Sequence, residues 1–205
     1  DLIGIDLMAD VLKSFIKELP EIDDFQIVAK EIPLIKKLIE TGYTGRKGKG
    51  GFYRMNKDGN KKILEAINLE TGEYFPTKKI DIKSEKVDLL KLINREDKYG
   101  DYAWAVISKI IKYASSLVPG ITDKFNDIDE AMRLGFNWSR GPFEMLKEIG
   151  VSNFFEKIDN FENNKFLEDL SNTKDENFYG ERQKYTEIET LGKIKSKALK
   201  LDKNN

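Results

Sequence analysis

The 205-residue chain contains no cysteine and no histidine. The absence of cysteine excludes disulfide bonds, thiol nucleophiles and thiolate metal sites. The absence of histidine removes the commonest general base near neutral pH and leaves carboxylates as the remaining strong side-chain ligands for a transition metal. These absences exclude imidazole and thiol chemistry, and we expect no metal site in this chain.

The chain also has little net charge and no long apolar run. Its 35 basic and 36 acidic side chains leave a formal charge of −1, so no overall field attracts nucleic acid or an anionic membrane. No apolar run approaches the roughly 18 residues of a spanning helix, and the first residues lack the pattern of a signal peptide. We expect a soluble, cytoplasmic protein with no nucleic-acid partner and no membrane span.

Apolar residues recur at helical spacing along most of the chain. The clearest helix runs from Asp6, as its cap, to about Leu19, and ends at Pro20. Other segments share this periodicity or have typical start and stop residues: 33–42, 84–95, 101–117, a short helix capped by Asp127 with Glu130 and ended by Gly135, 141–150, and one capped by Ser152. The Lys-rich, polar sequence of residues 186–205 predicts a marginal helix or a frayed linker.

Between residues 52 and 76 the pattern changes to short strands. The pairs Asp58-Gly59 and Thr71-Gly72 are typical of turns, which favours a β-hairpin or a three-stranded meander. Residues 63–69 are also compatible with a helix. The predicted fold class is all-α, a helical bundle in two halves joined by a small β-hairpin linker.

Two separated segments resemble one known family. The segment from Asn126 to Gly150, which contains Gly-Pro-Phe-Glu at 141–144, is similar to the helical C-terminal domain of NAD-dependent 3-hydroxyacyl-CoA dehydrogenases. The segment Gly-Arg-Lys-Gly-Lys-Gly-Gly-Phe-Tyr at 45–53 resembles the one that closes the same domain. The resemblance spans roughly residues 1 to 180. It implies a helical bundle like the C-terminal domain of 6-phosphogluconate and 3-hydroxyacyl-CoA dehydrogenases.

In that family an upstream Rossmann domain binds NAD and carries the catalytic His and Glu, while the helical domain helps to close the acyl-CoA cleft. The dinucleotide fingerprint is absent here, because the glycines at 45, 48, 50 and 51 have the wrong spacing and follow a helix. The resemblance therefore implies a non-catalytic C-terminal region of an oxidoreductase of fatty-acid β-oxidation. We expect no cofactor in this chain, and NAD in the complete enzyme. The polar end, 201–205, resembles the junction to an enoyl-CoA hydratase half in multifunctional members.

A weak internal duplication fits the tandem helical copies of longer family members. Residues 1–7 align with residues 147–153, each with a glycine at a helix end followed by an apolar residue. On this basis four segments are expected: the tail of a first helical copy at 1–56, a β-hairpin linker at 57–83, a second helical copy at 84–180, and a polar linker or tail at 181–205.

Six residues are candidate contacts to the acyl-CoA cleft or to another domain: Arg46, Lys47, Lys49, Trp138, Arg140 and Phe143. In the basic glycine-rich loop 45–54, exposed amides and basic side chains would bind phosphate, either of CoA or of RNA. The alternative is a structural turn whose Phe52 and Tyr53 dock in the core while the lysines stay solvated. A non-enzymatic RNA-binding module using this loop is the rival function.

The second half offers three further alternatives. Trp138 and Phe143 either pack in a core or line an acyl pocket. The acidic cluster of Asp127, Asp129 and Glu130 either binds a metal or caps a helix, and capping is favoured because the cluster lacks an EF-hand loop. Glu144 is either a general acid or base, or a residue that interacts with the helix N-terminus.

Overall fold

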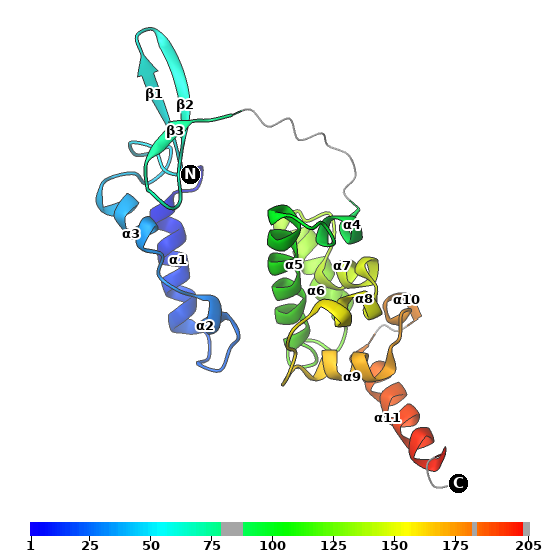
Figure 1. Ribbon diagram of the computed structural model, residues 1–205. Helices are drawn as coiled ribbons and strands as arrows, with labels where there is room; N and C mark the ends of the chain where they lie inside the picture. Colours follow the sequence, from blue (N-terminus) through cyan, green and yellow to red (C-terminus); the bar gives the residue numbers. More distant parts are fainter. Residues whose placement is uncertain (79–87, 182–183, 203–205) are drawn as a thin grey trace. The chain divides into compact units, whose positions relative to one another are not determined.

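The computed structural model describes residues 1–78, 88–181 and 184–202 (Figure 1). The chain divides into two compact units, Asp1–Lys83 and Ser84–Asn205. Helices dominate, and one small antiparallel sheet accompanies them. The predominance of helices and the small sheet agree with the predicted helical fold with a β-hairpin. The division into four segments stays a prediction. No helix in the described ranges is long and apolar enough to cross a membrane.

The first unit contains three helices and then a sheet of three strands. Its elements are α1 (Ile5–Glu18), α2 (Phe25–Val28), α3 (Pro33–Glu40), β1 (Tyr53–Asp58), β2 (Lys61–Ile67) and β3 (Tyr74–Pro76). The strands pair antiparallel in the order β1-β2-β3, which confirms the meander and makes the helical alternative for 63–69 wrong. Gly59 and Gly72 occupy the connections with φ of 57° and 73°, conformations that favour glycine.

The start of α1 differs from the prediction. Asp6 is not the cap, because Gly4 holds the N-cap position with φ 118° and Asp6 lies in the first turn. The Asp6 carboxylate instead pairs with Lys47, at 2.7 Å. Ile5 and Leu38 are the buried large apolar residues among the described residues of this unit. Its core is therefore small.

The described residues of the second unit form helices joined by loops, with no strand among them. Its helices are α4 (Leu89–Ile93), α5 (Lys98–Ser116), α6 (Phe125–Phe136), α7 (Pro142–Ile149), α8 (Val151–Lys157), α9 (Lys165–Thr173), α10 (Phe178–Glu181) and α11 (Tyr185–Asp202). The long α5 packs against α4, α7 and α9, and α11 packs against α9 (Figure 1). Five phenylalanines at most 1% exposed form the centre: Phe125, Phe143, Phe154, Phe166 and Phe178.

Several helix boundaries in this unit depart from the predictions. Helix α5 begins three residues before the expected 101, because the Asp97 carboxylate accepts hydrogen bonds from the amides of Tyr99 and Gly100. The Arg95 guanidinium, together with these amides, lowers the pKa of Asp97 to about 2. Helix α9 has no counterpart among the predicted elements. The marginal helix of the last segment is present through residue 202, while residues 84–87 and 203–205 of two predicted elements lie outside the described ranges.

Three predicted helix ends are wrong. Asp127 with Glu130 does not cap α6, because that helix begins earlier, at Phe125. The same helix continues past Gly135, and its last turn ends at Asn137 in the left-handed conformation, φ 55°. Ser152 lies inside α8 rather than at its cap.

Candidate functional site

The Gly-Pro corner at the start of α7 is organised by a carboxylate from another helix. Asp129 of α6 is fully buried, and its two oxygens accept hydrogen bonds from the amides of Phe143, at 2.8 Å, and Glu144, at 3.0 Å. A Cβ on Gly141 would overlap this carboxylate. The corner therefore requires glycine at 141 because Asp129 approaches so closely.

A second carboxylate and a phenol complete this arrangement. Glu144 accepts the Gly141 amide at 2.8 Å and pairs with the Arg133 guanidinium, while the Tyr179 hydroxyl hydrogen-bonds to Asp129. Burial raises the pKa of Asp129 to about 6, against the opposing effect of its hydrogen bonds. Burial also acts to raise the pKa of Glu144, but the Gly141 amide and Arg133 hold it below its ordinary value.

These contacts assign structural roles to the acidic residues of the corner. The interaction of Glu144 with its helix N-terminus is confirmed. Asp129 is fully buried with both oxygens engaged, so it has no face open to a substrate. Asp127 and Glu130 are exposed. Within the part of the chain that the structure describes, no three acidic side chains gather as metal ligands would.

The backbone amides of the glycine-rich loop are hydrogen-bonded within the first unit. Seven backbone N–H groups between residues 45 and 53 donate to acceptors inside the unit: those of Gly45, Arg46, Gly48, Lys49, Gly51, Phe52 and Tyr53. The Asp1 carboxylate accepts the amides of Phe52 and Tyr53, at 2.9 and 2.8 Å. An anion from outside would have to replace these acceptors, so the loop geometry does not support phosphate capture by exposed amides.

The basic side chains of the loop differ in how freely they reach solvent. Lys47 pairs with Asp6, and the Lys49 ammonium donates to the carbonyl oxygen of Thr41 at 3.0 Å. Arg54 pairs with Glu65 at 2.7 Å and lies over the Tyr74 ring at 4.0 Å. The lysines are exposed, as the structural alternative predicts, but they are also held by partners.

An open groove runs beside this loop and contains Arg46. It is lined by charged and apolar groups together: Asp1, Leu2, Gly45, Arg46, Gly48, Lys49, Gly50, Tyr53, Arg54, Met55 and Leu64. Tyr53 is 55% exposed, so its predicted docking in the core is wrong, while Phe52 is half-buried. Arg46 and Lys49 thus share a surface with apolar side chains, a combination that is common in small-molecule sites.

The other three candidate residues lie in the second unit. Phe143 is fully buried, so it packs in the core and does not line a pocket. Trp138 is half-buried, and Arg140 pairs with Glu148 at 3.1 Å. Asp129, at the centre of the Gly-Pro corner, was not among the predicted contacts. Its signal in the sequence is indirect: a Gly-Pro helix start without a local Ser, Thr, Asp or Asn cap needs an acceptor from elsewhere.

Comparison with known proteins defines the class. The chain belongs to the 3-hydroxyacyl-CoA dehydrogenase family, which confirms the resemblance seen in its motifs. It is 39% identical over 153 residues to a putative fatty acid oxidation complex trifunctional enzyme of Rickettsia prowazekii (strain Madrid E), a match that covers 75% of this chain and 21% of that protein.

Two further relatives agree. A putative fatty acid oxidation complex trifunctional enzyme of Rickettsia felis (strain ATCC VR-1525 / URRWXCal2) is 40% identical over 146 residues, covering 71% of this chain and 20% of that protein. A probable 3-hydroxyacyl-CoA dehydrogenase of Bacillus subtilis (strain 168) is 30% identical over 167 residues, with coverages of 78% and 20%. The matches thus span about a fifth of the length of these relatives. No protein-family model and no solved structure matches the chain.

Proposed function

We propose that this chain is a non-catalytic C-terminal region of an NAD-dependent (S)-3-hydroxyacyl-CoA dehydrogenase of fatty-acid β-oxidation. In the complete enzyme it supports the acyl-CoA cleft and contacts other domains or subunits, among them an upstream NAD-binding Rossmann domain. The observation that carries the proposal is the identity to these enzymes across 75% of a chain that has no histidine. Because the family's chemistry uses a His as base, hydride transfer to NAD takes place on residues outside this chain.

The packing of the second unit fits a supporting role. Its aromatic core fixes the helices, and the Asp129 carboxylate joins α6 to the start of α7 through two hydrogen bonds. A surface that positions a substrate must itself be held rigidly, since small displacements lose much of the catalytic effect. The duplicated helical copies and a downstream hydratase half belong to the same proposal, as does a cytoplasmic location.

For contact with acyl-CoA or a neighbouring domain, we propose the side chains that reach the surface. These are Arg46 and Lys49 beside the open groove of the first unit, and Trp138 with Arg140 in the second unit. Lys47 is a weaker contributor, because Asp6 already neutralises it. Phe143 contributes through the core that lies beneath the surface.

RNA binding by residues 45–54 receives no support from the described residues. The loop amides already have acceptors, and the formal charge of the chain is −1. An RNA complex held by basic side chains would weaken steeply as salt is added. Titration of labelled single-stranded RNA at low and high salt checks this alternative, and we expect no saturable binding at either.

The proposal is tested with two proteins: residues 1–205 alone and the full polypeptide that contains them. With NAD and an (S)-3-hydroxyacyl-CoA, we expect the full polypeptide to form NADH. Residues 1–205 should form none above a buffer blank and should not bind NADH. NAD reduction by the isolated chain would contradict the non-catalytic role, and an inactive full polypeptide would contradict the dehydrogenase assignment.

Arg46→Ala in the full polypeptide tests the contact surface. If Arg46 contacts the CoA portion, KM for the acyl-CoA should rise by roughly threefold to tenfold with kcat unchanged, as expected for loss of one uniform binding contact. Lys36→Ala is the matched control, because Lys36 is an exposed basic residue on α3 of the same unit. Equal KM values for the two variants would remove Arg46 from the site.

A further inference from the structure

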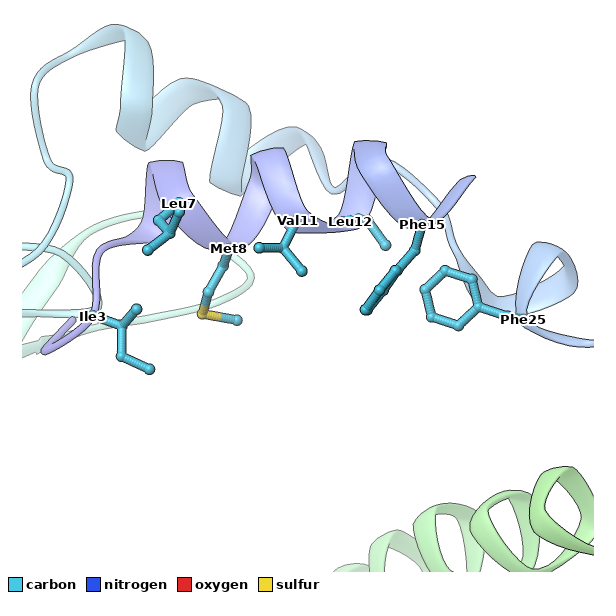
Figure 2. Close-up of a pocket in the computed structure, with 7 residues that line it drawn as sticks. All are labelled: Ile3, Leu7, Met8, Val11, Leu12, Phe15 and Phe25. Carbon is cyan, nitrogen blue, oxygen red and sulfur yellow. The ribbon is translucent and has the colours of Figure 1, made fainter. Parts of the chain in front are cut away.

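Helix α1 borders an open apolar groove (Figure 2). The groove is lined by seven apolar side chains: Ile3, Leu7, Met8, Val11, Leu12 and Phe15 along α1 and its entry, and Phe25 from α2. The rings of Phe15 and Phe25 meet edge to face at 5.6 Å and close one end. Figure 2 shows these side chains directed to the same side of α1. A contiguous apolar surface of this kind marks an interaction site.

The second unit contains a corner whose backbone is similar to that at the start of α1. The aligned Gly4 and Gly150 are both helix N-caps, with φ and ψ of 118° and 131° in one and 88° and 139° in the other. The residue that follows each glycine, Ile5 or Val151, is 1% exposed. The two aligned segments therefore share a glycine cap with positive φ and the buried apolar residue that follows it.

The two corners differ in what covers them. Ile149 and Phe154 of the second unit are fully buried, whereas the aligned Ile3 and Met8 of the first unit are 69% and 55% exposed. These positions are apolar in both copies, so both sequences suit a buried site. The difference lies in a covering element that the second unit possesses.

In the second unit α5 contributes to that cover. Its Trp104 ring meets the Phe154 ring at a centroid distance of 5.7 Å. The ammonium of Lys157, one turn along α8, lies 5.4 Å from the centre of the same Trp104 ring. A large aromatic side chain of an amphipathic helix therefore contacts Phe154, the buried residue that corresponds to the exposed Met8 of α1.

We infer that an amphipathic helix from outside residues 1–205, in the same polypeptide, fills the α1 groove, with a contact like that of Trp104 of α5 on Phe154 of α8. It would place a bulky aromatic or aliphatic side chain against Met8. The seven side chains that line the groove are apolar, which suits the apolar stripe of a helix. Relatives in which the match covers about a fifth of the protein have ample chain to supply it. The inference rests on the proposed function, because it takes the chain to be part of a longer enzyme.

Photo-cross-linking in the full polypeptide tests the occupant. A benzophenone amino acid replaces Met8 in one sample and Lys13, a solvent-facing residue of α1, in the other. We expect Met8 to give an intramolecular product several-fold more abundant than Lys13, with the linked peptide in a helical segment outside residues 1–205. Products that join two copies, that stay within 1–205, or that form equally from both positions would overturn the inference, as would no product.

A variant pair protects this test against a folding artefact. Met8→Asp should lower the melting temperature of the full polypeptide and leave that of residues 1–205 unchanged, because the groove is open in the isolated chain. Equal effects on both proteins would contradict the inference. NAD reduction is measured on the same full-length samples. An active enzyme without the cross-link refutes the groove occupant alone, and an inactive polypeptide with the cross-link refutes the proposed function alone.

Discussion

The two units use apolar residues differently. The second unit encloses its five phenylalanines within its own helices, whereas α1 of the first unit leaves most of its apolar stripe in contact with solvent. Apolar residues recur at helical spacing in the sequences of both units. The contrast indicates that periodicity identifies the apolar face of a helix but not the element that covers it. We therefore expect mutations to act unequally in the two units.

The largest expected difference comes from removing one ring in each unit. Phe166→Ala, at a fully buried site, should destabilise the second unit by about 3 to 5 kcal/mol. Phe15→Ala, at a site 50% exposed, should cost less than about 1 kcal/mol in the first unit. Both tryptophans lie in the second unit, so urea unfolding followed by tryptophan fluorescence reports on Phe166→Ala, and amide exchange in α1 reports on Phe15→Ala. Similar losses of stability in the two variants would contradict the proposed difference between the units.

Gly141→Val tests the Gly-Pro corner of the second unit. The added side chain would displace the Asp129 carboxylate, so we expect a loss of roughly 1 to 3 kcal/mol. Gly135→Ala on α6 is the control, because a Cβ there meets nothing within 4 Å. That change should be neutral or stabilise the helix by up to about 1 kcal/mol. Thermal melts of both variants measure these changes in stability. An unchanged melting temperature for Gly141→Val would show that the close approach of Asp129 does not require glycine at this position.

The buried Asp129 predicts a pH dependence confined to the second unit. Burial raises its pKa from 3.8 to about 6, so between these values the folded state binds a proton that the unfolded state has released. The contribution of Asp129 to stability is therefore fully present below about pH 4 and decreases as pH rises to about 6, by up to about 3 kcal/mol.

Asp129→Asn isolates this contribution, because asparagine does not titrate. The stability of the wild-type protein relative to the variant should fall as pH rises from about 4 to about 7. Urea midpoints from tryptophan fluorescence across this range provide the measurement. Parallel curves for the two proteins would show that Asp129 has no raised pKa in the folded state.

The smallest effect is expected for the basic loop of the first unit. Lys47→Ala combined with Lys49→Ala removes an exposed ion pair and one bond to a carbonyl oxygen. Exposed pairs contribute little, so the loss should stay below about 1 kcal/mol. A larger loss in thermal melts would mean that the loop is a structural centre of the first unit, comparable with the Gly-Pro corner of the second.

The sequence predicted those features that depend on neighbouring residues. Pro33 begins α3, and Gly59 with Gly72 forms the connections of the meander. Helical periodicity placed α1 and α5, and the Gly141-Pro142 start with the Gly150 stop placed α7. Each of these depends on backbone conformations that proline, glycine or an apolar stripe favours locally.

The caps could not be predicted in this way. The amides at the start of α7 are accepted by Asp129, from 14 residues earlier, and those at the start of α8 by Glu176, from 25 residues later. Asp1 does the same for amides of the glycine-rich loop. A capping motif is a pattern of adjacent residues, so it cannot reveal an acceptor that tertiary folding brings from a distance.

In the candidate site, too, features that depend on neighbouring residues were predicted and contacts between distant residues were not. The buried alternative for Phe143 is visible from the sequence because it lies in the first turn of an amphipathic helix. The neutralisation of Lys47 by Asp6 is not visible, since 41 residues separate them and only the folded unit joins them. The exposed apolar face of α1 is equally hidden, because its periodicity is that of an ordinary core helix.

Hydrogen–deuterium exchange compares the two units most directly. Residues 1–205 alone and the full polypeptide are exchanged side by side, and peptides from α1, α5 and α9 are followed. We expect α5 and α9 to be protected in both proteins, whereas α1 should exchange rapidly in the isolated chain and become protected in the full polypeptide. Protection of α1 equal to that of α5 in the isolated chain, or no gain for α1 in the full polypeptide, would contradict the claim that the first unit is completed by a helix from outside residues 1–205.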